Sequence, residues 1–281
     1  MRKAIVSVIN DLSTEQRVHK VCLFLLKRGY AVTLVGRKQK ESLPLDSRPY
    51  KTKRMFLFFE KGALFYAEYN FRLFLFLLFQ KADFFAYNDI DTLLPNLFVS
   101  KMSRVSLVYD SHEYFTGVPE LKGKKFKKSV WRVIERFCFP KLKNVYTVNQ
   151  SIADLYENKY NVKVKVVRNF PIHKEVVIPN IKKYMGLPED KNIIIYQGSV
   201  NMERGVSEAI EAMQYVVGAV LLIIGRGDVL GEMKLLVQKL QLQHKIIFHD
   251  KVPFEQLRQY TLHAAIGISL DKDTNINYHY S

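Results

Sequence analysis

Short runs of β-branched residues alternate with helical patterns along most of this 281-residue chain. The first unit consists of the run KAIVSVI at 3–9, a helical pattern through Val18, Cys22 and Leu25, and the run YAVTLVG at 30–36. Two strands joined by a helix of this length lie parallel, with a right-handed crossover. The alternation therefore predicts an α/β chain built on parallel sheets.

The alternation occurs in two series, separated by a polar stretch that contains Pro171 and Pro179. Further strands are predicted at 82–88, 105–112, 144–149 and 164–171 in the first series, and at 192–198, 218–228, 245–250 and 264–270 in the second. We therefore expect two Rossmann-like domains facing each other, formed by residues 1–170 and 171–281. The second has fewer strands than doubly wound sheets usually have. Together with the ending DKDTNINYHYS, this predicts an incomplete second domain and a C-terminally truncated chain.

Local patterns predict several further features of the first domain. Ser13 and Gln16 have the spacing of a capping box at the start of the first helix. The run LFLFLLF at 73–79 is too short to span a membrane and predicts a buried helix. Another helix is expected at 131–139. The two cysteines fall within helical patterns, which fits a reducing, cytoplasmic environment.

The net charge of +16 lies entirely in the first part of the chain. Residues 1–168 carry 31 Lys and Arg against 15 Asp and Glu, whereas residues 169–281 carry 12 of each. We expect the first part to face something anionic, with nucleic acid, a phospholipid surface and a phosphorylated substrate all open. The stretch KGKKFKK at 122–128 is either a binding patch for lipid phosphate or a solvated loop, and the loop is the simpler interpretation.

The stretch YQGSVNMERGVSEAIEAM at 196–213 combines a strand end at Gly198, a loop cation at Arg204, and a helical pattern after Gly205. A strand, loop and helix start of this kind is either a phosphate cradle or an ordinary turn. A second glycine turn, IIGRGD at 223–228, follows the next predicted strand. Two such turns at one sheet edge favour a nucleotide site.

The segment VYDSHEYF at 108–115 places Asp110, His112 and Glu113 at the end of a strand of the first domain. His112 either contacts a ligand or lies in a surface turn, and the loop position favours the ligand. The two acidic residues fit an acid/base pair or an ordinary turn. The other histidines lack the spacing of metal ligands, so we expect no metal site.

Together these segments, with NDIDTLLP at 88–95 and NVYTVNQSIADLY at 144–156, resemble the retaining glycosyltransferases of the GT-B fold, family four. The resemblance extends from the first strand to the last residue. It implies transfer of a sugar from a UDP- or GDP-sugar to an acceptor hydroxyl, without a metal cofactor. The acceptor would be a lipid-linked saccharide or cell-surface glycan, and the enzyme would be cytoplasmic, either free or peripheral on the inner face of the membrane.

The resemblance also implies roles for individual residues. Arg204 would grip the donor diphosphate and His112 would contact the donor sugar, so these two carry catalysis. The donor loops would comprise Gly198, Ser199, Gly205, Gly225 and Gly227, and the acceptor side Gln16, Arg17 and Glu113.

The sequence departs from the family pattern at three places. The usual Gly-Gly loop after the first strand is replaced by NDLSTEQR, and Ser199 replaces a frequent arginine. The paired glutamates spaced eight apart would lie beyond Ser281. The alternative function is a basic binding protein for nucleic acid or anionic membrane without catalysis, although zero net charge in 169–281 argues against nucleic acid there. A dinucleotide-dependent oxidoreductase is disfavoured because NDLSTEQR contains no glycine.

Overall fold

A computed structural model describes residues 1–13, 15–40, 42, 44–45, 47–118, 121, 123–170, 186–252, 254–274 and 276–279. The chain divides into two compact units, Met1–Pro171 (unit 1) and Ile172–His279 (unit 2). The domain boundary predicted at 170/171 and the prolines 171 and 179 adjoin or fall within a stretch outside the described residues.

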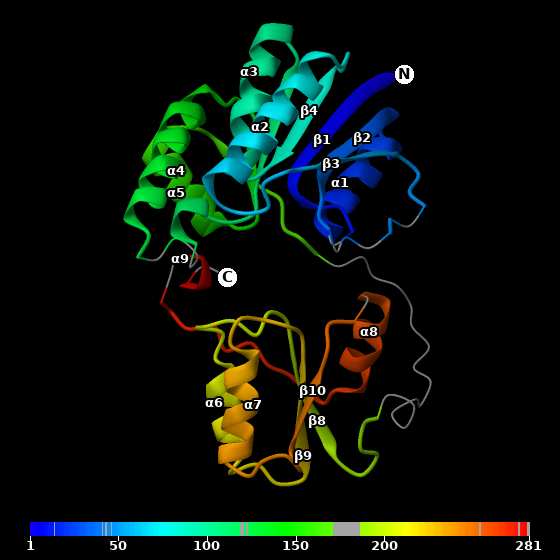
Figure 1. The fold of residues 1–281 in the computed structure, drawn as a ribbon, viewed down its shortest axis with the longest axis vertical. Helices are drawn as coiled ribbons and strands as arrows, with labels where there is room; N and C mark the ends of the chain where they lie inside the picture. Colours follow the sequence, from blue (N-terminus) through cyan, green and yellow to red (C-terminus); the bar gives the residue numbers. More distant parts are fainter. Residues whose placement is uncertain are drawn as a thin grey trace. The chain divides into compact units, whose positions relative to one another are not determined.

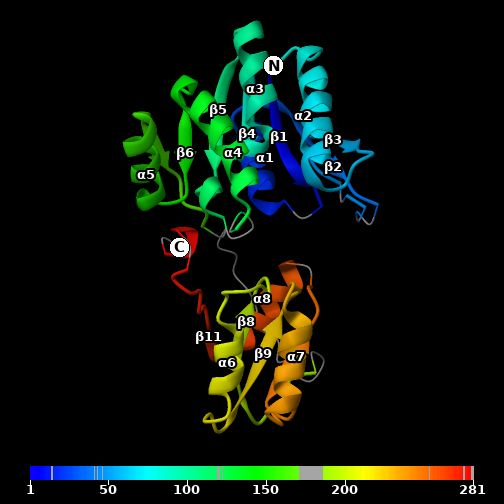
Figure 2. The ribbon, with the colours of Figure 1, turned by 60° about the vertical axis from the view of Figure 1, so that its left-hand side comes forward.

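Unit 1 is built on a seven-stranded parallel sheet with the order β3-β2-β1-β4-β5-β6-β7. Figure 2 shows β1, β4, β5 and β6 side by side in this order. Because the order reverses between β1 and β4, a crevice is expected at the carboxyl ends of these two strands. The strands are β1 (Arg2–Asp11), β2 (Tyr30–Lys38), β3 (Lys51–Phe56), β4 (Phe84–Asn88), β5 (Ser106–Ser111), β6 (Val145–Thr147) and β7 (Val164–Val166).

Helices cover both faces of this sheet. Alternate residues of β1 point to opposite faces: Val6 and Val8 pack in a cluster with α1, whereas Ile5 and Ile9 pack in a cluster with α2. The helices are α1 (Gln16–Lys27), α2 (Gly62–Leu78), α3 (Leu93–Ser103), α4 (Lys125–Cys138) and α5 (Gln150–Tyr160), with 3-10 turns η1 (Ile90–Thr92), η2 (Phe115–Gly117) and η4 (Phe139–Lys141).

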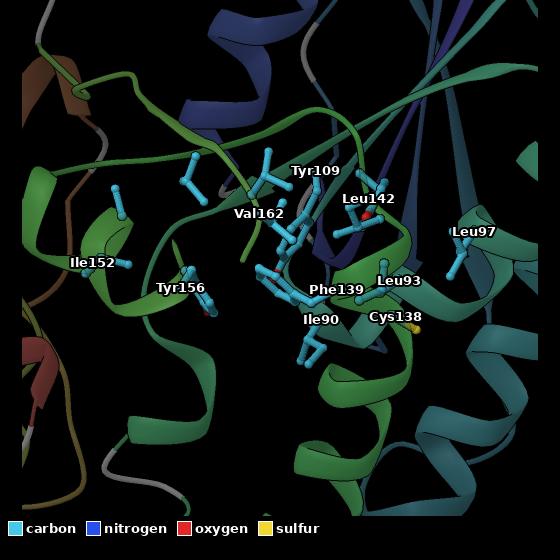
Figure 3. Close-up of a cluster of buried hydrophobic side chains, with 14 residues drawn as sticks. Ile90, Leu93, Leu97, Tyr109, Cys138, Phe139, Leu142, Ile152, Tyr156 and Val162 are labelled. Atoms are coloured by element: carbon cyan, nitrogen blue, oxygen red, sulfur yellow. The ribbon is translucent and has the colours of Figure 1, made fainter. Parts of the chain in front are cut away.

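Aliphatic and aromatic side chains together form the core that packs against β4, β5 and β6 (Figure 3). Phe139 stacks on Tyr156 with ring centroids 4.4 Å apart and meets Tyr109 edge-on at 5.4 Å. Cys138 packs in the same cluster, and Cys22 lies on the buried face of α1; both thiols are free and buried. These contacts fix the strand ends from which the polar residues of unit 1 project.

Unit 2 has a four-stranded parallel sheet with the order β10-β9-β8-β11. Helices α6 and α7 cover one face and α8 covers the other (Figure 1). The strands are β8 (Asn192–Gln197), β9 (Ala219–Ile224), β10 (Ile246–His249) and β11 (Ile266–Gly267). The helices are α6 (Val206–Ala212), α7 (Leu230–Lys239), α8 (Phe254–His263) and α9 (Ile276–His279). The prediction of an α/β chain with two Rossmann-like parallel sheets is confirmed.

Four details of the sequence prediction are wrong. Strand β3 was not predicted, and β11 covers two residues instead of seven. Helix α4 begins at Lys125, so most of the basic stretch is helical rather than a loop; Lys122 lies outside the described residues. The described residues form no capping box: none of them caps α1 with a side chain, and the backbone N–H of Ser13 donates to Asp11 Oδ1 at 3.2 Å.

Helix α2 also differs from its prediction as a buried helix. In the run 73–79, Leu73 and Leu77 are buried at a spacing of four residues, whereas Leu75 and Phe79 are 38% and 78% exposed. Within the described part of the chain, no helix combines the length and the apolar composition needed to cross a membrane.

Candidate functional site

Two glycine-containing loops follow the neighbouring strands β8 and β9 of unit 2. The backbone N–H of Gly198 donates to the carbonyl of Ile224 at 3.0 Å, which continues the strand pairing into the loops. A Cβ at Gly225 would lie 1.8 Å from the carbonyl oxygen of Gly198, and a Cβ at Gly227 would lie 2.0 Å from that of Val200. Glycine is therefore required at both positions for the loops to lie this close.

A pocket of about 390 Å³ opens at the carboxyl end of β8. Three of the predicted donor residues, Gly198, Ser199 and Arg204, line it together. The rest of its wall comes from β8 (Ile195, Tyr196, Gln197), from α8 (Thr261), and from β11 and the segment after it (Gly267, Ile268, Ser269, Asp271). Gly205, the residue after Arg204, is the N-cap of α6 and does not line the pocket.

The Arg204 side chain is held at this pocket by an ion pair. Its Nη1 lies 3.0 Å from Oδ1 and 3.1 Å from Oδ2 of Asp271, and the two side chains are 33% and 17% exposed. The helix that follows has only seven residues and carries Glu208 in its first turn. A helix this short has a weak dipole, and the negative charge of Glu208 offsets its positive N-terminal end, so the main cation of this loop is Arg204.

The carboxyl edge of the unit 1 sheet carries a buried ion pair. Asp110, at the end of β5, accepts from Arg17 Nε at 3.2 Å and is also in contact with Arg17 Nη2. The Tyr146 hydroxyl donates to the same carboxylate at 2.8 Å. The side chain of Asp110 is 3% exposed and that of Arg17 13%, so both charges are buried. The two nitrogens of the Arg17 guanidinium and the Tyr146 hydroxyl compensate the buried carboxylate.

His112 lies between two carboxylates at this edge. Its Nδ1 is 3.6 Å from Asp89 Oδ1 and 3.7 Å from Asp110 Oδ1, and its backbone N–H donates to Asp89 at 3.4 Å. Desolvation raises the pKa of Asp89, with Asp110 adding to the effect and His112 opposing it. Asp89 adopts φ 58° and ψ 165°, a region that non-glycine residues seldom occupy.

Two further acidic residues lie close to this group. Burial is the main cause that raises the pKa of Glu15 and, more strongly, that of Asp91, and the charge of Asp89 adds to both. Of the other predicted acceptor-side residues, Gln16 is the exposed first residue of α1, and Glu113 follows the end of β5. The structure thus brings Arg17 and His112 together around Asp110.

Within the described ranges of the chain, no group of three or more His, Cys, Asp or Glu side chains is arranged to hold a metal ion.

Comparison with known proteins gives a family. Residues 14–170 match the family model described as Glycosyltransferase Family 4, and residues 177–270 match that described as Glycosyl transferases group 1. The chain belongs to glycosyltransferase family 4. No curated protein sequence matches this transferase.

Solved structures share the fold of the transferase at low identity. Sucrose-phosphate synthase from Thermosynechococcus elongatus is similar with a TM-score of 0.72 and 15% identity, over 95% of this chain and 75% of that one. HepE of Anabaena, in complex with UDP and glucose, has a TM-score of 0.68 and 11% identity, over 95% and 73%. WaaG, a glycosyltransferase involved in lipopolysaccharide biosynthesis, has a TM-score of 0.61 and 15% identity, over 95% and 74%. These likenesses establish the GT-B fold.

Sequence reasoning missed two acidic residues of the transferase. Asp271, which contacts Arg204, follows the shortest strand of unit 2, and Asp89, which contacts His112, follows β4. Both positions lie just after strands that end at a sheet's carboxyl edge, and that placement was the signal available for finding them.

We predict that Gly205→Ala destabilises unit 2 more than an ordinary glycine substitution. Gly205 has φ +67°, and a Cβ there would lie 2.2 Å from the carbonyl oxygen of Leu270, so the segment after β11 has to move. Gly218 is the control, because it has φ +74° but nothing within 4 Å of its Cβ. Gly218→Ala should cost about 1 kcal/mol and Gly205→Ala at least about 2 kcal/mol, measured by denaturant unfolding. Equal losses would contradict the close approach.

We predict that Asp91→Asn stabilises unit 1 at pH 7 and loses this effect in acid. Oδ1 of Asp91 is buried and has no hydrogen-bond partner among the described residues, and burial raises its pKa. Because the pKa of Asp91 in the folded protein is raised above its ordinary value of 3.8, the carboxyl group lowers the stability of the fold increasingly as the pH rises above 3.8, and this cost is absent in stronger acid. The gain should be about 1–3 kcal/mol at pH 7 and shrink towards pH 5, measured by thermal unfolding. The exposed Asp154→Asn serves as control; a gain that does not depend on pH would contradict the assignment.

Proposed function

We propose that unit 2 binds the nucleotide sugar, with the diphosphate lying against Arg204. The observation that carries this proposal is that Arg204 lines one pocket with Gly198 and Ser199 at the carboxyl end of β8. Ligands of doubly wound sheets bind at this edge, and the arginine fork matches phosphate oxygens. The HepE structure holds UDP and glucose on the same fold. These points support a UDP- or GDP-sugar as the donor.

The chemistry needs a cation at this place. When the bond from the sugar to the diphosphate breaks, negative charge grows on the departing oxygen. A cation fixed beside that oxygen stabilises the transition state more than the bound donor, and this difference lowers the barrier. We propose that Arg204 fulfils this role without a metal ion, and that the transfer retains the anomeric configuration, as the family resemblance implies.

We propose that unit 1 binds the acceptor. Gln16, Arg17 and Glu113 lie at the carboxyl edge of its sheet, where the strand order reverses. Arg17 is engaged with Asp110, so its role is to hold this edge in shape beside the acceptor rather than to move freely. We propose that His112 contacts the sugar that is transferred, while Asp89 lies beside its Nδ1.

We further propose that helix α4 docks on an anionic membrane, where a lipid-linked acceptor would be found. Phe126, Val130, Val133 and Phe137 form an apolar stripe at helical spacing and are 83%, 44%, 64% and 46% exposed. At helical spacing, four basic residues of the same helix lie to the sides of this stripe: Lys125, Lys127, Arg132 and Arg136. Lys124 and Lys128, at the start of the helix, add to its positive charge. An exposed apolar stripe bordered by lysine and arginine is typical of helices that lie in the membrane interface.

We predict that Arg204→Ala weakens binding of UDP or GDP by roughly ten- to more than a hundredfold. That range corresponds to the loss of a charge-assisted hydrogen bond to phosphate. Arg204→Lys should keep part of the affinity, since lysine provides charge without the fork. Titration calorimetry measures both, with Lys239→Ala, at the far end of α7, as a charge-matched control. Undiminished affinity in Arg204→Ala would make the loop an ordinary turn, and the proposed donor site would be abandoned.

We predict that replacing Lys124, Lys125, Lys127 and Lys128 by Gln weakens binding to vesicles that contain anionic lipid. The expected loss is about 1 kcal/mol for each charge near the surface, and high salt should mimic it. Flotation measures the bound fraction. The matched control replaces four exposed lysines at the opposite edge of the sheet, Lys38, Lys40, Lys51 and Lys53. Equal losses in both variants, or equal flotation on neutral vesicles, would argue against a specific α4 surface.

A further inference from the structure

The segment that follows β11 is fastened to the loop that carries Arg204. The backbone N–H of Lys272 donates to the carbonyl of Glu203 at 2.9 Å, and the Thr274 hydroxyl donates to the Glu203 carboxylate at 2.6 Å. The Lys272 ammonium also pairs with Glu208 in the first turn of α6. None of these contacts involves Arg204 itself, so the segment has its own attachment to the loop.

This attachment determines where the carboxylate of Asp271 lies. Asp271 precedes the fastened residue Lys272, and on its other side Leu270 packs directly against Gly205, where no Cβ intervenes. The Asp271 side chain is only 17% exposed and lies in the wall of the pocket. Its carboxylate is therefore a fixed point, held from both sides by contacts of its neighbours.

Asp271 in turn restrains the guanidinium of Arg204. Both carboxylate oxygens contact the same nitrogen, Nη1, at 3.0 and 3.1 Å. This pair uses at most two of the five N–H groups of a guanidinium. An arginine side chain has several rotatable bonds, and ordering it when a ligand binds opposes binding. A guanidinium that is already anchored by one nitrogen loses less conformational entropy when the ligand binds.

We propose that Asp271 is a positioning residue for the donor diphosphate, holding Arg204 at the pocket before the nucleotide sugar arrives. The proposal rests on the donor site proposed above. By its charge alone, the Asp271 carboxylate would repel phosphate from this pocket. Positioning Arg204 explains why a carboxylate nevertheless lies in the pocket wall. The opposite possibility, that Asp271 competes with phosphate for Arg204, predicts the opposite sign in the experiment.

The experiment titrates the chain and its variants with UDP, GDP and inorganic pyrophosphate. Asp271→Asn should weaken binding of the nucleotide that the unaltered chain binds, and of pyrophosphate, by roughly three- to thirtyfold, in line with losing part of the ordering of one arginine. Asp271→Glu should restore part of the affinity. Asp273→Asn is the matched control, because it removes the same charge two residues away at a side chain that is 73% exposed.

A double-mutant cycle shows whether Asp271 acts through Arg204. In an Arg204→Ala background, Asp271→Asn should cause no further loss of affinity. Unchanged or tighter binding in Asp271→Asn would overturn the proposal. It would also be overturned if Asp271→Asn lowered the affinity of the Arg204→Ala variant by as much as it lowers that of the unaltered chain. A loss in Arg204→Ala with none in Asp271→Asn would refute only the positioning role. Unchanged affinity in Arg204→Ala would instead remove the donor site itself.

Discussion

A parallel strand needs cover on both of its faces, and this requirement shapes both units of the transferase. Strands β1 and β8 bury side chains on both of their faces, so helices pack on each side of both sheets. Each crossover returns the chain to the same end of the sheet, which brings the carboxyl ends of all strands to one edge. The candidate site residues of each unit lie at this edge of its own sheet.

The sequence predicted most of this fold, because buried parallel strands are apolar runs that stand out from their surroundings. It missed β3, whose sequence KTKRMF is an edge strand with mostly exposed side chains and no apolar alternation. It also misjudged α2, since a helix made almost entirely of apolar residues gives no sign of which face is covered. The expected capping box failed because Asp11, not a helix start, engages Ser13.

The residues of the candidate site were partly predictable from the sequence, but the pairings between them were not. The glycine loops could be recognised from the sequence, because two loops that lie this close leave no room for any other residue at positions 225 and 227. Arg204 was visible as a loop cation, but its partner Asp271 lies 67 residues further along the chain. Pairings across such separations depend on how strands are ordered in the sheet, and no local pattern records them. The same applies to Arg17 and Asp110, which are 93 residues apart.

The buried cysteines of unit 1 have a practical consequence for labelling. Burial raises the pKa of Cys22 to about 12 and that of Cys138 to about 11, and both side chains are fully shielded from solvent. Thiol reagents attack the thiolate, which is almost absent from these two residues at neutral pH. Since the chain contains only these two cysteines, a third one introduced on the surface would react first and essentially alone. A fluorophore could therefore be attached at any chosen surface position without first removing a native thiol from the core.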